Sequence, residues 1–175
     1  MIPIDPSKLR LMYFPSPVLK RRAMDVTDFG PGLGALTRRM LAVMREGNGV
    51  GLAGPQVGVP ARVFVCNVTG EPDGDLVFVN PTFVELSGAE EKEEGCLSIP
   101  GVHVTMRRAV RATIAACDVY GKSFMLGATG LLARAWQHEV DHLDGRLIID
   151  NMSPTDEIAN RRILRQLRKD YAGPE

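Results

Sequence analysis

The sequence predicts an α+β fold, in which antiparallel or mixed β-sheets pack around a central helix, with further helices toward the N- and C-termini. Two observations predict it. The β-prone segments follow one another in hairpin-like runs, and the helix-like segments are few. A doubly wound fold would instead alternate strands with helices along the chain. A length of 175 residues fits a single domain that buries its own core.

The first half of the chain predicts one helix and then two strands. Residues 33–45 carry Leu and Met at helical spacing, and Gly47-Asn48-Gly49 ends this segment. Two β-prone segments follow, separated by a stretch rich in Gly, Pro and Asp. These predicted strands are residues 62–67 and 76–80.

The second half of the chain predicts a hairpin, a helix, a short strand and a last helix. The hairpin joins a β-prone segment, residues 110–120, to a returning strand, residues 122–126. Ser153, followed by Pro154 and Asp156, has the pattern of a helix N-cap. The remaining segments are the helix at 131–144, the short strand at 146–150 and the last helix to about residue 171.

Composition and charge exclude several classes of protein. Basic and acidic residues number 21 each, so no net charge draws the chain to DNA or to an anionic membrane. No apolar run reaches the roughly 20 residues that span a bilayer, and the N-terminus lacks a secretory signal pattern. Three widely spaced cysteines argue against a disulfide framework. These features predict a cytoplasmic protein without DNA or membrane partners.

The segment His138-Glu139-Val140-Asp141-His142 indicates a metal site. On the predicted helix, residues four apart share a face, so both imidazoles can reach one ion. Glu139 lies beside them, where it can act as a general base on water. The pattern points to metal-assisted attack of water on a carbonyl group. Taken alone it is unspecific, because solvated polar residues or two core histidines bonded to the backbone would also produce it.

Cys96 is the best candidate for a third metal ligand. Gly95 permits close backbone approach, and Pro100 stiffens the exit from this segment. One thiolate, two imidazoles and a water make a four-coordinate catalytic site. A free cysteine is more often a small buried hydrophobe, and we interpret Cys66 and Cys117 in that way because both lie in apolar β-prone segments.

Residues 49–58 form a glycine-rich segment that is the third informative block. It lacks the Lys of a phosphate-binding loop, and it does not follow a predicted strand as a dinucleotide fingerprint does. A plain turn would also explain the glycines. Gln56 favours a functional site, because an uncharged amide donor close to the water can stabilise an oxyanion.

Together, three blocks of the sequence resemble the peptide deformylase family. They are Gly49-Val50-Gly51-Leu52-Ala53-Gly54-Pro55-Gln56, Glu94-Gly95-Cys96-Leu97-Ser98 and Gln137-His138-Glu139-Val140-Asp141-His142, in the family's order. The resemblance covers nearly the whole chain, and the three blocks together are highly specific. It implies one catalytic domain over residues 1–175 that removes the N-formyl group from the formylmethionine of nascent polypeptides and releases formate.

The resemblance also implies the metal chemistry. Cys96, His138 and His142 are the implied ligands of one divalent metal ion, and Glu139 is the implied general acid and base. Fe(II) is the implied physiological ion, with Zn, Ni or Co able to occupy the same site. The softness of the ligands by itself would suit Zn.

Substrate contacts follow from the same resemblance. Gln56 and the backbone N–H of Leu97 are the implied oxyanion donors. The expected substrate-binding residues are Gly51 and Gly95, which hold the peptide backbone like an added strand, and Val50, Leu131 and Ala135, which shape a methionine-sized pocket.

Two positions depart from the family's pattern. Gly54 stands where the family commonly has Ala, and we expect it to add backbone freedom beside Gln56. Arg134 stands where many members have an apolar residue at the methionine pocket. We expect its aliphatic stem to line the pocket and its guanidinium to reach water.

The last predicted helix is basic, and its charge has two explanations. A solvated face would account for it, whereas the resemblance implies docking to the ribosome through phosphate contacts. The basic residues are Arg161, Arg162, Arg165, Arg168 and Lys169.

Two other functions compete with deformylation. An HExxH metallopeptidase that cleaves internal peptide bonds shares the chemistry, but it usually takes its third ligand from a downstream Glu or His. A non-catalytic metal-binding or ribosome-associated module would have no use for Glu139 or Gln56.

Overall fold

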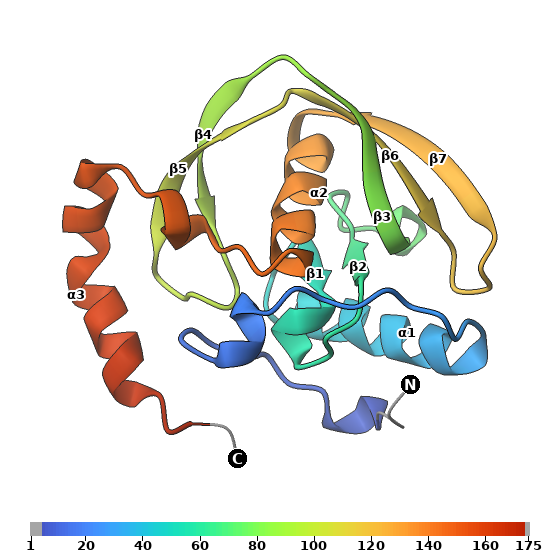
Figure 1. The fold of residues 1–175 in the computed structure, drawn as a ribbon, viewed down its shortest axis with the longest axis horizontal. Coiled ribbons are helices and arrows are strands. Elements are labelled where there is room, and N and C mark those ends of the chain that lie inside the picture. Colours follow the sequence, from blue (N-terminus) through green and yellow to red (C-terminus); the bar gives the residue numbers. More distant parts are fainter. Residues whose placement is uncertain (1–4, 174–175) are drawn as a thin grey trace.

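A computed structural model describes residues 5–173, in which three α-helices pack with two antiparallel sheets (Figure 1). The predicted α+β class is confirmed. The helices are α1 (Pro31–Glu46), α2 (Gly130–Leu143) and α3 (Pro154–Asp170). The strands are β1 (Gly51–Ala53), β2 (Val63–Cys66), β3 (Leu76–Ser87), β4 (Glu90–Gly95), β5 (His103–Arg108), β6 (Arg111–Cys117) and β7 (Ser123–Thr129).

Five strands form the larger sheet in the order β1-β2-β3-β6-β7, and every neighbouring pair is antiparallel. The long strand β3 lies in the middle of this sheet. Its first part pairs with β2, and its later part pairs with β6. A register shift interrupts it between Val79 and Thr82, where Asn80 adopts a positive φ of 51°. Strands β4 and β5 form a separate two-stranded ribbon.

Helix α2 occupies the centre of the molecule, with the β4–β5 ribbon on one side and β3, β6 and β7 on the other (Figure 1). Aromatic packing fixes it against the larger sheet. The Trp136 ring lies 5.1 Å from that of Phe78, which stacks on Phe64 at 4.6 Å. All three side chains are fully buried, so burial on the order of 25 cal/mol per Å² stabilises the helix that carries both histidines.

The N- and C-terminal helices complete two further parts of the core. On one side, α1 buries Leu36, Met40 and Met44 against β1 and β2. On the other, α3 contributes Leu164 to a cluster with Ile99 and Val104 beside the ribbon. The cap predicted for α3 is present: the Ser153 hydroxyl accepts a hydrogen bond from the Asp156 N–H at 3.1 Å.

Several expected segments differ in the structure. The short strand expected at 146–150 is wrong: Ile148–Asn151 forms a 3-10 helix, because the Asp150 carboxylate accepts from the Leu147 N–H at 2.8 Å and tightens the turn. The strand expected at 76–80 continues to Ser87 through the register shift. The glycine-rich segment contains β1 and a 3-10 helix, Gly54–Val57, rather than only a loop.

Over the described residues, no helix is long and apolar enough to cross a membrane. All three cysteines are free thiols. Cys66 is fully buried in β2, as expected, whereas Cys117 is only half-buried near the end of β6.

Candidate active site

The two histidines of α2 face one another across a single turn. Their Nε2 atoms lie 3.2 Å apart, and the rings meet at an angle of 71°. His142 is buried, and burial lowers its pKa well below the usual range, with a further lowering from His138. His142 is therefore a neutral imidazole, the form that binds a metal ion.

Cys96 completes the cluster from the loop after β4. Its Sγ atom lies 3.3 Å from His142 Nε2, and the three donor atoms of Cys96, His138 and His142 all lie within 4.8 Å of one another. The set of one sulfur and two ring nitrogens matches a catalytic metal site that keeps an open position. These three side chains thus fit a divalent metal in both donor chemistry and proximity.

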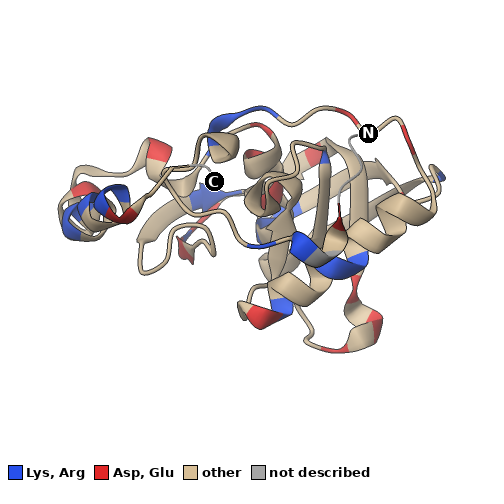
Figure 2. Ribbon diagram, turned by 90° about the horizontal axis from the view of Figure 1, so that it is seen from below, with Lys and Arg blue, Asp and Glu red and all other residues tan. Residues whose placement is uncertain are grey.

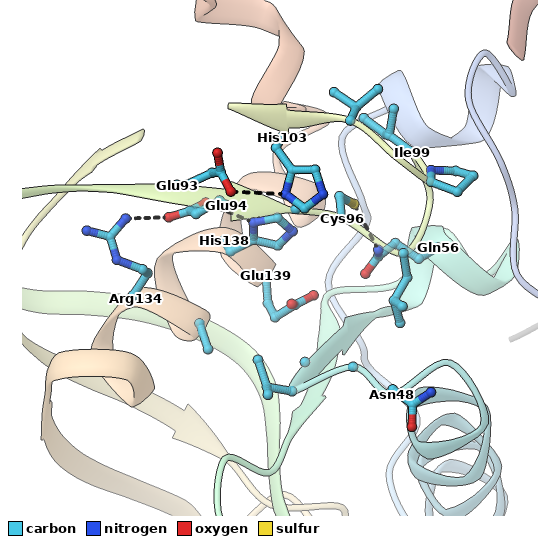
Figure 3. A pocket seen from close by; sticks show the side chains of 18 of the residues that line it. Asn48, Gln56, Glu93, Glu94, Cys96, Ile99, His103, Arg134, His138 and Glu139 are labelled. Atoms are coloured by element: carbon cyan, nitrogen blue, oxygen red, sulfur yellow. Dashed lines mark hydrogen bonds and ion pairs between the residues drawn. The ribbon is translucent and has the colours of Figure 1, made fainter. Parts of the chain in front are cut away.

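Glu94 orients His138 from the opposite side of the ring. One carboxylate oxygen lies 3.1 Å from His138 Nδ1 (Figure 3). Because Nδ1–H donates to this anion, Nε2 is the ring nitrogen that faces the cluster and is left for a metal ion. The hydrogen bonds from His138 and Arg108 outweigh burial and lower the pKa of Glu94 to about 2. Glu94 belongs to the second sequence block, but the sequence pattern did not predict a role for it.

Glu139 has the opposite environment. The side chain is buried, and its Oε2 atom has no hydrogen-bond partner among the described residues. Burial raises the pKa of this carboxyl to about 7. The group can therefore exchange a proton near neutral pH, which suits general acid–base chemistry.

Gly51 makes room for the Glu139 carboxylate. A Cβ atom at this position would lie 2.3 Å from Glu139 Oε1 and 2.9 Å from its Cγ. The glycine in β1 is thus needed for close side-chain approach, in addition to any contact that its backbone makes with a peptide.

The Gln56 amide points at Cys96 from the 3-10 helix after β1. Its Oε1 accepts from the Ala53 N–H at 2.9 Å, which fixes the orientation of the amide. Its Nε2 lies 3.5 Å from Cys96 Sγ and donates to the buried Ser98 hydroxyl at 3.2 Å. Like Glu94, Ser98 belongs to the second sequence block and had no predicted role. In the structure its hydroxyl holds the Gln56 amide in place.

A cavity of about 440 Å³ opens beside this cluster (Figure 3). Residues of the β1 segment, of β4 and the loop after it, and of the first turns of α2 line this cavity. All five expected substrate-binding residues line it: Val50, Gly51, Gly95, Leu131 and Ala135. The Leu97 side chain also lines the cavity and packs against Gly47 and Gly49, where a Cβ would lie within 3.1 Å and 2.6 Å of its methyl groups.

Comparison with known proteins assigns this site to a family. A sequence profile described as "Polypeptide deformylase" matches residues 8–157. A curated peptide deformylase from Hahella chejuensis is 40% identical over 166 residues, covering 94% of this chain and 97% of the relative. The chain belongs to the peptide deformylase family. The metallopeptidase alternative finds no support in these comparisons.

Further relatives agree with this placement. "Peptide deformylase 1" of Clostridium perfringens is 46% identical over 134 residues, which is 77% of this chain and 90% of the relative. The crystal structure of a peptide deformylase from Legionella pneumophila superimposes with a TM-score of 0.87 at 39% identity, covering 92% of this chain and 95% of that one. Peptide deformylases are metalloenzymes that remove the N-formyl group from nascent peptides, and the cluster of Cys96, His138 and His142 is a possible metal-binding group.

One departure from the peptide deformylase pattern behaves differently from expectation. The Arg134 stem lines the cavity, but its guanidinium does not reach water: the residue is 7% exposed and donates to Glu94 Oε1 at 2.7 Å. The expectation of a solvated guanidinium is therefore wrong. The guanidinium binds the Glu94 carboxylate on the neighbouring β4–β5 ribbon instead of water.

The second departure, Gly54, serves a close contact and not only backbone freedom. A Cβ at this position would lie 2.7 Å from the Ala61 carbonyl oxygen and 2.8 Å from that of Val59. The loop after the 3-10 helix therefore passes too near for the Ala that is common in peptide deformylases, unless the loop shifts.

Proposed function

We propose that this chain deformylates nascent polypeptides with Cys96, His138 and His142 as metal ligands and Glu139 as the general acid and base. The observation that carries the proposal is the convergence of three metal-binding atoms beside a buried carboxyl group, one oxygen of which has no partner in residues 5–173. Residues 1–175 would act as one catalytic domain. The proposed compartment is the cytoplasm, where nascent chains emerge.

The chemistry is the hydrolysis of a formamide. When bound, the divalent metal supplies a water that is acidic near neutral pH and a Lewis acid for the formyl oxygen. Glu139 takes a proton from the attacking water and returns it to the departing amine nitrogen as the C–N bond breaks. The products are formate and a free N-terminal amine.

The oxyanion that forms during the attack needs hydrogen-bond donors. Gln56 Nε2 is held toward Cys96 by the bonds of the same amide to Ala53 and Ser98, so the donor is in place before substrate arrives. We assign the second donor to the backbone N–H of Leu97. Removing the amide in Gln56→Ala should lower turnover about 10²–10³-fold.

The substrate pocket accommodates the methionine side chain between β1 and α2. Val50, Leu131 and Ala135 provide its apolar wall, and they all line the cavity. Gly51 of β1 and Gly95 of β4 both line the cavity, and the backbone of the peptide would run between these two strands like an added strand.

One assay tests the proposal. Formylated and unformylated methionyl peptides are incubated with the protein, its metal content is measured in the same sample, and formate and peptide masses are recorded. Release of formate from an otherwise intact peptide supports deformylation. Internal cleavage, or no turnover with one equivalent of metal, would reject it.

The identity of the metal is a separate proposal. We infer Fe(II) as the physiological ion, with Zn, Ni or Co as possible occupants of the same ligands. Elemental analysis of protein purified without oxygen tests this, and a preparation that holds Zn alone at full activity would contradict it.

We further propose that α3 docks on the ribosome. Figure 2 shows several basic positions along the ribbon of this helix. Three of its exposed arginines have no ion-pair partner among the described residues. They are Arg161, Arg162 and Arg165. Reversing Arg161 and Arg165 to Glu should abolish salt-sensitive co-sedimentation with ribosomes, while the exposed Arg38→Glu on α1 should not. Co-sedimentation unchanged by the reversal would reject docking.

A further inference from the structure

Arg134 is a buried arginine on α2, one turn before His138. Its guanidinium makes three contacts with the β4–β5 ribbon. Nη1 donates to Glu94 Oε1 at 2.7 Å and to the Met106 carbonyl at 3.1 Å, and Nη2 donates to the Glu90 carbonyl at 2.8 Å. One side chain thus fastens the central helix to both strands of the ribbon.

The contact with Glu94 completes the hydrogen bonding of that carboxylate. Oε1 accepts from Arg108 Nε at 3.0 Å and from Arg134 Nη1. Oε2 accepts from Arg108 Nη2 at 3.0 Å and from His138 Nδ1. A carboxylate offers about four acceptor positions. Each position of Glu94 therefore has a donor, and Arg134 occupies the one that Arg108 and His138 leave.

A carboxylate held at all its acceptor positions cannot turn. Its plane then fixes the hydrogen bond to His138 Nδ1, and this bond fixes both the ring orientation and the nitrogen that carries the lone pair. That nitrogen, Nε2, lies 3.2 Å from His142 Nε2. The chain of contacts runs without a gap from Arg134 through Glu94 to the proposed ligand.

We propose that Arg134 is a positioning residue of the metal site, acting on His138 through Glu94. The inference rests on the ligand set proposed above. It assigns a role to a position where the sequence departs from the common apolar residue. The competing explanation is that Arg134 supports only the fold, by joining α2 to the ribbon.

Arg62 provides a matched control for that explanation. It is buried to a similar degree, at 9% exposed against 7% for Arg134. It also braces α2, donating to the Leu143 carbonyl at 3.4 Å and to Asp144 Oδ1 at 2.8 Å. Among the described residues, none of its hydrogen bonds or ion pairs reaches Glu94 or His138.

The first experiment compares Arg134→Met with Arg62→Met. The affinity of each protein for Co(II) is measured by competition with a chelator, and thermal unfolding is followed in the metal-free state. We expect both variants to lower the unfolding temperature, and only Arg134→Met to weaken Co(II) binding, by about 10-fold or more. Equal Co(II) affinity in wild type and Arg134→Met would overturn the proposal.

A double-mutant cycle decides whether Arg134 acts through Glu94. In a Glu94→Gln background, Arg134→Met should cost no further Co(II) affinity, because the carboxylate that it holds is gone. Additive losses would overturn the proposed route. If Arg134→Met does not fold, Arg134→Lys enters the same cycle, with a smaller loss expected because an ammonium cannot span all three acceptors. A wild-type protein that fails to bind Co(II) would instead overturn the metal site itself.

Discussion

Glu94 and Glu139 are buried carboxyl groups on either side of one histidine, and their surroundings are opposite. Glu94 accepts hydrogen bonds from two arginines and from His138, and its pKa falls to about 2. Glu139 has one oxygen without a hydrogen-bond partner among the residues that the structure describes, and burial raises its pKa to about 7. The same functional group is a fixed anion in one place and a proton carrier in the other.

The comparison shows that the partners, and not burial by itself, decide the role of a carboxyl group in this site. Both residues are less than 10% exposed. Only Glu94 has donors for its charge, so only Glu94 is held as an anion that orients another residue. Pairs of acids whose environments push their pKa values apart are typical of sites that run proton chemistry.

The largest expected effect comes from removing the proton carrier. Glu139→Gln keeps the size of the side chain but cannot accept a proton from water, so deformylation should fall about 10²–10⁴-fold. Metal content should stay at the wild-type level, because Glu139 is not among the proposed ligands. Turnover near that of wild type with metal bound would show that the proton moves by another route.

Much of the fold was predictable because its signals are local. Helix α3 has its Ser153 cap in the sequence, and α2 has its apolar pattern. Strand β4, Glu90–Gly95, was missed because its residues are mostly Glu and Lys, which disfavour strands. Pairing with β5 and the burial of Glu94 among arginines stabilise it, and neither is visible in a window of the sequence.

The candidate site divides in the same way. His138, His142 and Cys96 carry the signals of spacing and residue type, so the sequence predicts them together. Glu94 depends on partners 14 and 40 residues away, Arg108 and Arg134, and only the tertiary fold brings these charges into contact. For the same reason, the prediction that the Arg134 guanidinium reaches water was wrong.

A smaller effect is expected from crowding the proton carrier. Gly51→Ala places a methyl group within 2.3 Å of Glu139 Oε1 and forces the carboxylate to move. A displacement of about 1 Å at a reacting group can cost about 10²-fold in rate, so turnover should fall toward that limit while metal affinity stays unchanged. Gly127→Ala is the matched control, because a Cβ on that β7 glycine meets open space. Equal activity in both variants would contradict the tight fit.

The smallest expected effect extends the comparison to a buried acid outside the site. Burial raises the pKa of the Cys66 thiol from 9.0 to about 12. Above pH 9 the unfolded thiol loses its proton while the folded thiol keeps it, so each pH unit up to about 12 favours unfolding by about 1.4 kcal/mol. Denaturant unfolding of wild type and Cys66→Ala between about pH 8.5 and 10.5 measures this, because the two proteins differ in no other side chain. The wild-type stability should fall more steeply with pH, and parallel curves would show that the buried thiol ionises as readily as an exposed one.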